Sequence, residues 1–326
     1  MQKLRIGRFV FFGVALAVLG GVIVRAADGD LEVLQLRPNF YMIGGAGGNV
    51  AVEVGEDGVV VVDSGSVDKA PAVVAAIKKI TSAPIRYVIN TSSDADHVGG
   101  NEIVAKAGQT LYLLRLIGLP AGFTGDAASI LADERVLTRM SAPSGKTSQY
   151  PFAAWPTEIY NSDFRNMYLN GEGIEVIHQK GHSDGDSIVF FRKSDIIVAG
   201  DIYDTTRFPV IDIENGGSIQ GEIDSLKRIA NMAIASVPII SREAGTIVIP
   251  GHGHVGDQWD LVHYRDMMVI IRDHVADCLK KGMTLEQTKA KMPTLGFGAR
   301  YGSKTGPWTT DKFVEAIYRS LEKAKS

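Results

Sequence analysis

Metal-binding side chains recur in four short segments of this sequence: NTSSDADHVGGN at 90–101, GHSDGD at 181–186, VAGD at 198–201 and PGHGH at 250–254. Imidazole and carboxylate groups together are ligand types suited to zinc, iron or manganese. A metal ion held by such groups activates water and polarises carbonyl or phosphoryl oxygens, which is the chemistry of hydrolysis. The candidate ligands are Asp94, Asp96, His97, His182, Asp201 and His252.

Each segment lies at the end of an apolar run that predicts a β-strand. These runs are IRYVIN, GIEVIHQ, DIIVAG and TIVIPG, at 85–90, 173–179, 195–200 and 246–251. Sites in sheet proteins commonly gather at strand ends. A single aspartate or histidine in a loop is ordinary, but three of the seven histidines in the chain occupy these strand ends. The joint pattern therefore predicts a shared metal site.

The order of predicted elements along the chain indicates the fold. Strands, a helix, a further strand and a helix are followed by the same theme again, which predicts an α/β (α+β) protein with two β-rich halves. A four-layer αββα sandwich fits this order. We expect this domain at 27–275, with an irregular insertion at about 115–165 and a C-terminal helical extension at 276–326 that packs on the domain. The insertion is either a loop-rich segment with its own small core or a wall of the active-site pocket.

The first 26 residues differ from the rest of the chain. Three basic residues precede an apolar run of 16 residues, and small residues follow it. This is typical of a cleaved secretory signal peptide at 1–26. A retained membrane anchor is the alternative, although the run is shorter than the roughly 20 residues that a spanning helix needs. We therefore expect a periplasmic or secreted protein with no stable membrane insertion after cleavage.

Composition narrows the function further. The chain has 326 residues, 45% of them hydrophobic, and a formal net charge of -3. No basic stripe with interleaved aromatic residues is present, so we expect a small-molecule substrate and no nucleic-acid partner. The one cysteine, Cys278, excludes an intramolecular disulfide, and its place in an amphipathic pattern predicts a buried, inert thiol.

These motifs resemble those of the metallo-β-lactamase-fold hydrolases over roughly residues 32–270. The first family motif, T-H-x-H-x-D-H followed by glycines, is matched by TSSDADHVGG, with Thr91 in register. GHSDG, VAGD and PGHG match three further motifs, and VVVVDSG matches a segment that places Asp63 behind the site. The segments 39–65 and 207–218 resemble a secreted branch of the family associated with quinoprotein systems.

The resemblance implies a ligand set. Asp96, His97 and His252 would bind one metal, Asp201 would bridge two metals, and His182 would serve the other. The two remaining histidines of the family fall on Ser92 and Asp94. Asp94 can supply a third ligand to the second metal, because zinc also accepts carboxylate oxygen. The resemblance therefore predicts one or two zinc ions, with manganese or iron as alternatives because a carboxylate favours harder ions.

The implied function is that of a secreted metal-dependent hydrolase. A metal-bound hydroxide would attack a small ester, amide or lactam, and Asp96 or Asp201 would orient it and take its proton. We expect residues 203–217 to form one pocket wall and residues 115–165 another.

Two other functions fit parts of the sequence. The changes at Ser92 and Asp94 favour a non-catalytic periplasmic binding or accessory protein that keeps the fold with an impaired metal site. A carboxylate-rich di-iron redox enzyme is a third hypothesis, although the chain shows no signature of the flavin domain that would supply electrons.

Overall fold

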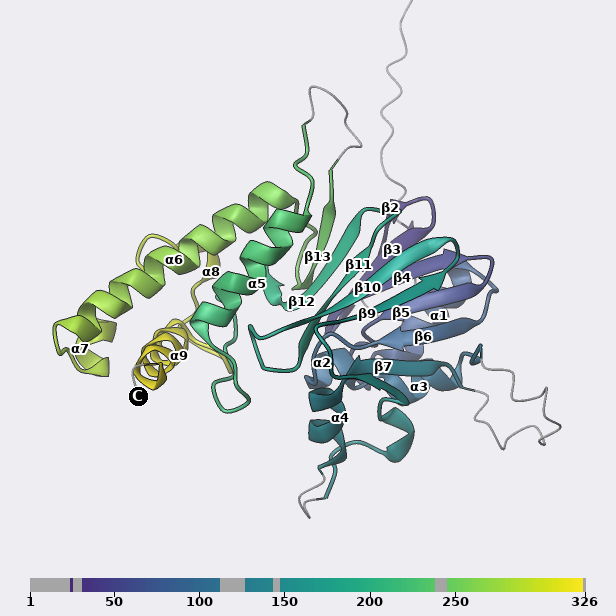
Figure 1. Cartoon of the computed structure of the whole chain (residues 1–326), viewed down its shortest axis with the longest axis horizontal. Helices are drawn as coiled ribbons and strands as arrows, with labels where there is room; N and C mark the ends of the chain where they lie inside the picture. Colours follow the sequence, from purple (N-terminus) through teal and green to yellow (C-terminus); the bar gives the residue numbers. More distant parts are fainter. Residues whose placement is uncertain (1–23, 26–30, 112–126, 143–146, 238–244, 325–326) are drawn as a thin grey trace, which may run out of the picture.

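The structure, a computed structural model, describes residues 24–25, 31–111, 127–142, 147–237 and 245–324. Within these residues, two β-sheets pack face to face, and helices cover the outer face of each (Figure 1). The four-layer αββα sandwich predicted from the sequence is therefore confirmed.

The first sheet follows the chain order from β1 to β8. Its strands from β1 to β5 are antiparallel neighbours, and those from β5 to β8 are parallel. The parallel part matters for the site, because the carboxyl ends of its strands meet at one edge. The strands are β1 Val24–Arg25, β2 Glu32–Arg37, β3 Phe40–Ala46, β4 Gly48–Gly55, β5 Gly58–Val62, β6 Ile85–Ile89, β7 Ser129–Asp133 and β8 Glu158–Tyr160.

The second sheet has the order β13-β12-β11-β10-β9. Its strands are antiparallel except for the parallel pair β12 and β13. The loop after β10 and the carboxyl-terminal parts of β12 and β13 carry three of the sequence motifs. The strands are β9 Phe164–Leu169, β10 Glu172–Gln179, β11 Asp186–Phe191, β12 Ile196–Asp204 and β13 Ile247–His252.

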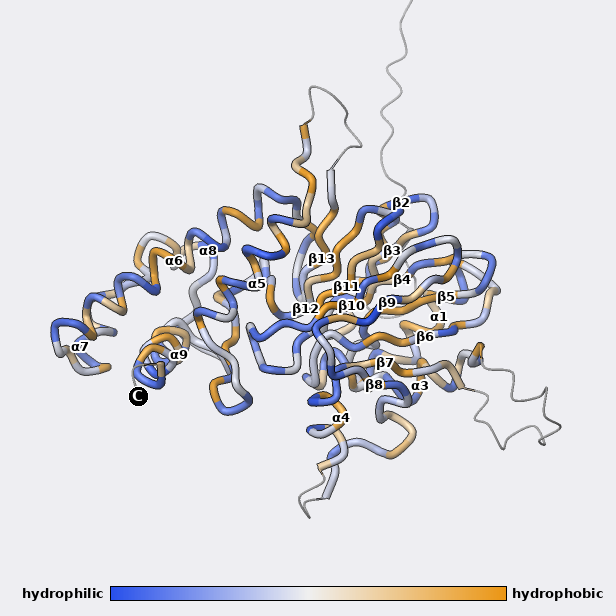
Figure 2. The backbone as a smooth tube through the Cα atoms, in the orientation of Figure 1, coloured by the Kyte–Doolittle hydropathy of each residue, from blue (hydrophilic) through white to orange (hydrophobic). Residues whose placement is uncertain are grey.

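The core between the sheets comes from strand residues that alternate with residues on the outer faces. Val60, Val62 and Ile89 of the first sheet pack with Val189 and Val198 of the second, and all five are buried. Burial of this kind contributes roughly 25 cal/mol per Å² of apolar surface. Hydrophobic residues accordingly concentrate in the strands of both sheets, coloured orange in Figure 2. This core fixes the strand ends that carry the candidate ligands.

The outer layers are formed by helices from opposite halves of the chain. On the first sheet, α1 and α3 cover an apolar face. On the second, α5 and α6 pack together, and α9 packs against both. Capping side chains begin the longer helices, with Ser218 at α5 and Asp257 at α6. The helices are α1 Ala70–Ile80, α2 Ala95–Val98, α3 Asn101–Lys106, α4 Glu134–Ser141, α5 Ile219–Met232, α6 Gln258–Lys280, α7 Leu285–Ala290, α8 Gly298–Tyr301 and α9 Thr310–Lys323.

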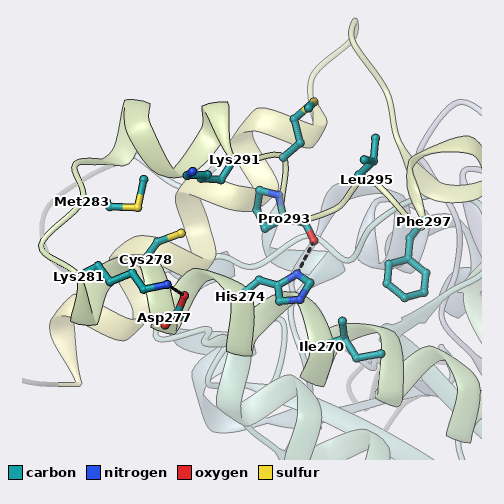
Figure 3. A pocket seen from close by; sticks show the side chains of 12 residues that line it. Ile270, His274, Asp277, Cys278, Lys281, Met283, Lys291, Pro293, Leu295 and Phe297 are labelled. Atoms are coloured by element: carbon teal, nitrogen blue, oxygen red, sulfur yellow. Dashed lines mark hydrogen bonds and ion pairs between the residues drawn. The ribbon is translucent and has the colours of Figure 1, made fainter.

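The C-terminal extension is held to the domain by aromatic packing. Phe313 of α9 stacks on Phe208, with ring centroids 4.7 Å apart. A cavity of about 750 Å³ lies between the second half of α6 and the segment 291–297 (Figure 3). Cys278 is a free, buried cysteine at this cavity, as the sequence predicted.

The segment 115–165 differs from the irregular insertion that the sequence indicated. Its described part contributes β7 and β8 to the edge of the first sheet, and α4 follows β7 directly. The two strands have only five and three residues, so they lack the long apolar run that marks a buried strand.

The predicted signal peptide at 1–26 lies outside the described residues, apart from β1, whose two residues pair with β2. No helix in the described part of the chain is long and apolar enough to cross a membrane.

Candidate metal centre

The loop after β6 brings three candidate ligands to the carboxyl edge of the first sheet. Asp94 precedes the short helix α2, and Asp96 and His97 lie within it. A buried pair of amides supports this loop, since Asn90 and Asn101 each donate to the other at 3.0 and 2.8 Å. Ser64 also donates to the Asn101 carbonyl oxygen, at 2.9 Å. Because these polar groups satisfy one another, the loop is held in one conformation.

Asp96, His97 and His252 form the first cluster. Each offers one ligand atom, and these atoms lie within 4.8 Å of one another. His252 comes from the end of β13, and its Nε2 atom lies 3.4 Å from Asp96 Oδ2. His97 is fully buried, whereas the other two are partly exposed. Two imidazoles and a carboxylate provide the three protein ligands that a catalytic zinc site commonly has.

Asp94, His182 and Asp201 form the second cluster, also within 4.8 Å. His182 lies in the loop after β10, and its Nε2 atom is 3.3 Å from Asp94 Oδ2. That contact lacks hydrogen-bond geometry, so Nε2 is a buried polar atom with no hydrogen-bond partner among the described residues. Such an atom is costly unless a ligand satisfies it, which fits a metal ion at this position.

Asp201 lies between the two clusters. Its Oδ1 atom is 3.2 Å from His97 Nε2 and 3.3 Å from His252 Nε2. The sequence placed Asp201 at the end of a strand, but β12 continues to Asp204 through a register irregularity that begins near Gly200. Gly200 has a φ of +56°, and a Cβ there would lie 2.6 Å from the Thr91 hydroxyl. Irregularities of this kind re-aim side chains beside active sites, and this one directs Asp201 toward the histidines.

Neighbouring groups orient the two buried imidazoles. Asp63 Oδ2 lies 2.7 Å from His97 Nδ1, and it also accepts from the Thr91 hydroxyl at 2.7 Å. The backbone oxygen of Val210 lies 2.9 Å from His182 Nδ1. In both residues Nδ1 donates outward and Nε2 faces the site, which is the usual arrangement of a metal-binding histidine.

The electrostatics of the site favour positive charge. Burial lowers the pKa of His97, but the carboxylates of Asp201 and Asp63 outweigh it and raise that pKa well above its ordinary value. Burial likewise lowers the pKa of His182, but Asp94 and Asp201 outweigh this effect and raise that pKa well above its ordinary value. Burial raises the pKa of Asp201, but the imidazoles, above all His97, hold it well below its usual range. Closely spaced carboxylates thus attract cations to this site. A divalent ion would take the place of the protons that His97 and His182 otherwise hold at this site.

Ser92 is one of the two positions at which the sequence resemblance predicted a replaced histidine. The residue is 1% exposed, and its hydroxyl accepts the backbone N–H of Asp94 at 3.3 Å. Its hydroxyl therefore serves the local turn. Asp94, the other such position, faces His182 and belongs to the second cluster.

A cavity of about 410 Å³ adjoins the second cluster, and Asp94 and His182 line it. Residues 210–214 form one wall, within the segment 203–217 that the sequence predicted for this role. Trp308 and residues of α9 form another wall, and none of the described residues of the segment 115–165 lines this cavity. Burial, and then the charges of Asp94 and Asp96, raise the pKa of Tyr150 in that segment.

Three supporting residues were not identified from the sequence. Asp186 is buried and shapes the loop of His182 by accepting from the backbone N–H and hydroxyl of Ser183 at 2.8 and 2.6 Å. The sequence signal available for Asp186 was its position as the last residue of the motif GHSDGD. The Asn90 and Asn101 pair gave none, because isolated asparagines are common in loops.

Comparison with known proteins agrees with the fold and the motifs. The sequence profile of the metallo-beta-lactamase superfamily matches residues 43–252, which include all six candidate ligands. The chain therefore belongs to the metallo-beta-lactamase superfamily, whose members include hydrolases.

Individual relatives are distant. A linear primary-alkylsulfatase from Pseudomonas sp. is 20% identical over 266 residues, covering 73% of this chain and 48% of that protein. The structure of a stereoselective inverting sec-alkylsulfatase from Pseudomonas sp. has a TM-score of 0.62 at 12% identity, covering 88% of this chain and 49% of that one. A metallo-beta-lactamase from Pontibacter korlensis has a TM-score of 0.53 at 17% identity, covering 73% and 98%. The chain spans about half the length of the alkylsulfatases it matches.

Proposed function

We propose that this chain is an exported, metal-dependent hydrolase of a small ester, amide or lactam. The observation that carries the proposal is the convergence of six candidate ligands in two clusters, each with its ligand atoms within 4.8 Å. The buried Nε2 atom of His182 supports it, because this atom has no hydrogen-bond partner among the described residues and a metal ion would satisfy it.

The two clusters define which residues would hold the metal. Asp96, His97 and His252 would bind one ion, Asp94 and His182 would bind a second, and Asp201 would face both. When bound, zinc or a harder ion such as manganese or iron would supply an activated water and a Lewis acid for the scissile group.

The side chains of the chain have distinct roles in this proposal. Asp96 is partly exposed at the first cluster, so its carboxylate can orient the attacking water and accept its proton. Asp201 remains ionised because the imidazoles hold its pKa low, and it provides the charge shared by both clusters. Asp63 and the Val210 carbonyl keep His97 and His182 in the tautomers that direct Nε2 inward.

The distant relatives indicate a further class of substrate to be tested first. Two of them are named alkylsulfatases, so sulfate esters belong in a screen beside carboxylic esters and lactams. One fold hosts many reactions, and the scissile group must therefore be found by experiment.

Single substitutions at the first cluster test the proposal. Asp96→Ala and His252→Ala should each lower kcat/KM at least a hundredfold on whichever substrate the screen identifies, because each removes a metal ligand. His254→Ala is the matched control, since His254 is exposed and belongs to neither cluster. Full activity in either ligand variant would contradict the mechanism.

A non-catalytic binding or accessory role is the second candidate. The observation that favours it is Ser92, which is buried where the family carries a ligand and is engaged in the local turn. This function predicts that the protein binds a small molecule while no ester, sulfate ester, amide or lactam is hydrolysed at any metal loading.

Export rests on the N-terminal sequence, with its basic residues, short apolar run and small residues before position 27. The intact mass of the protein from a bacterial periplasm should match a chain that begins near Ala27. A full-length mass in the membrane fraction would instead indicate a retained anchor.

A further inference from the structure

The cavity beside the second cluster has apolar inner walls and a charged rim. Val210 and Ile213 line one side, and the Trp308 ring and the buried Ala316 line the other. The charged lining residues Glu214, Lys312 and Arg319 are exposed. Pockets for small ligands are commonly apolar clefts of about 300–1,000 Å³ with a few polar groups that fix orientation, and this cavity lies within that range at about 410 Å³.

Both walls of the cavity are fixed. The Val210 carbonyl accepts from His182, and the Asp212 backbone N–H donates to the His182 carbonyl at 2.8 Å, so this wall is tied to a candidate ligand. The α9 wall is held by the stack of Phe313 on Phe208. Shape is therefore built into the cavity before any ligand binds.

Two of the charged residues that line the cavity, Glu315 and Arg319, form ion pairs, whereas Lys312 and Asp212 contact neutral groups. Glu315 pairs with Lys289 and Arg319. Lys312 donates to the Pro307 carbonyl at 2.6 Å, and the Asp212 carboxylate accepts from Asn215. An apolar group that leaves water for the walls formed by Val210, Ile213, Trp308 and Ala316 would add to the binding energy of a ligand.

We propose that this cavity is a specificity subsite that seats the apolar acyl or alkyl part of the substrate, with the scissile group at Asp94 and His182. The inference rests on the proposed function and assigns the substrate an amphipathic character. Trp308 and Ala316 lie beyond the family-matched residues 43–252, so the C-terminal extension of this chain would set the chain-length preference.

Binding of short fatty carboxylates tests the subsite without requiring turnover. Acetate and hexanoate would be titrated calorimetrically into the full mature protein loaded with zinc. Hexanoate should bind at least tenfold more tightly than acetate, because each buried methylene favours binding. Equal affinities for the two carboxylates would overturn the proposal.

Filling the cavity should remove that preference. In Ala316→Phe the affinity ratio of hexanoate to acetate should fall to within about twofold, while acetate affinity is unchanged. Ala324→Phe is the matched control, because Ala324 is exposed after the end of α9. Ile213→Ser should lower the ratio independently if Ala316→Phe fails to fold. A wild-type ratio in every folded variant would overturn the proposal.

Hydrolysis of p-nitrophenyl acetate and p-nitrophenyl hexanoate distinguishes a failure of the proposed hydrolase function from a failure of the proposed subsite. Tight hexanoate binding without hydrolysis of either ester, or of any sulfate ester, amide or lactam in the screen, would reject the proposed function and leave the subsite standing. Hydrolysis with no dependence on chain length in the wild type would reject the subsite and leave the hydrolase standing.

Discussion

His97 Nδ1 lies 2.7 Å from Asp63 Oδ2, and this contact leaves His97 Nε2 facing Asp201 Oδ1 at 3.2 Å. Asp63 adopts a left-handed φ of 61°, which aspartate and asparagine tolerate better than most residues. The position of the His97 ring thus depends on the buried carboxylate of Asp63, which directly follows β5.

Asp63→Asn should weaken metal binding at the first cluster by about 10- to 100-fold, because the amide holds the imidazole less firmly and lowers its basicity. Asparagine also keeps the left-handed conformation accessible. Zinc affinity would be measured by competition with a chromophoric chelator. Asp68→Asn, at an exposed position five residues on, is the control and should bind zinc like the wild type. Unchanged affinity in Asp63→Asn would show that Asp63 does not support a metal ligand.

Phe313→Ala should lower the free energy of unfolding by about 3–5 kcal/mol, because it removes a fully buried ring and leaves a cavity beside Phe208. Denaturant unfolding followed by tryptophan fluorescence measures this. Phe152→Ala is the control, since Phe152 is 80% exposed and its loss should cost less than about 1 kcal/mol. Equal effects of the two substitutions would mean that α9 is not docked on the domain as described.

Glu53 should make stability depend on pH. Burial, opposed by the Asn170 hydrogen bond and reinforced by the charge of Glu172, raises the pKa of Glu53 from 4.5 to about 7. Between these values the unfolded chain releases its proton while the folded protein retains it. Stability contributed by this group is therefore present below pH 4.5 and lost as pH rises to about 7.

Glu53→Gln should remove this dependence. Compared with the wild type, the variant should gain on the order of 1 kcal/mol in unfolding free energy between pH 5 and pH 8, after allowance for solvent screening. Thermal unfolding at both values measures the change. Glu56→Gln, at an exposed neighbouring position, should follow the wild type. If Glu53→Gln also follows the wild type, the Glu53 carboxyl group of the wild type is ionised in the folded protein throughout this range.

The sequence predicted the layers and the positions of the candidate ligands because both have local signals. Apolar runs that end in glycine and histidine located His97, His182 and His252 at strand ends, and the structure brings these strand ends together. The turn of Asp201 toward the histidines was not predictable, because the irregularity near Gly200 depends on the close approach of Thr91.

Long-range packing left the least trace in the sequence. The cavity wall formed by Trp308 and Ala316 meets residues 210–214 about a hundred positions earlier in the chain, and no local pattern records that contact. The strands β7 and β8 were missed for a related reason, since each is stabilised by its neighbour in the sheet more than by its own short sequence.

The central claim is the proposed two-ion centre, in which Asp94 would be a ligand of the second ion. Its most direct test is elemental analysis of the mature protein, purified without chelators or a histidine tag, beside Asp94→Ala. Asp94 is partly exposed, and its carboxylate lies 3.3 Å from the Nε2 atom of His182, so its loss should release the second ion alone. We predict close to two metal ions per chain in the wild type and close to one in the variant. No bound metal in either protein would contradict the account.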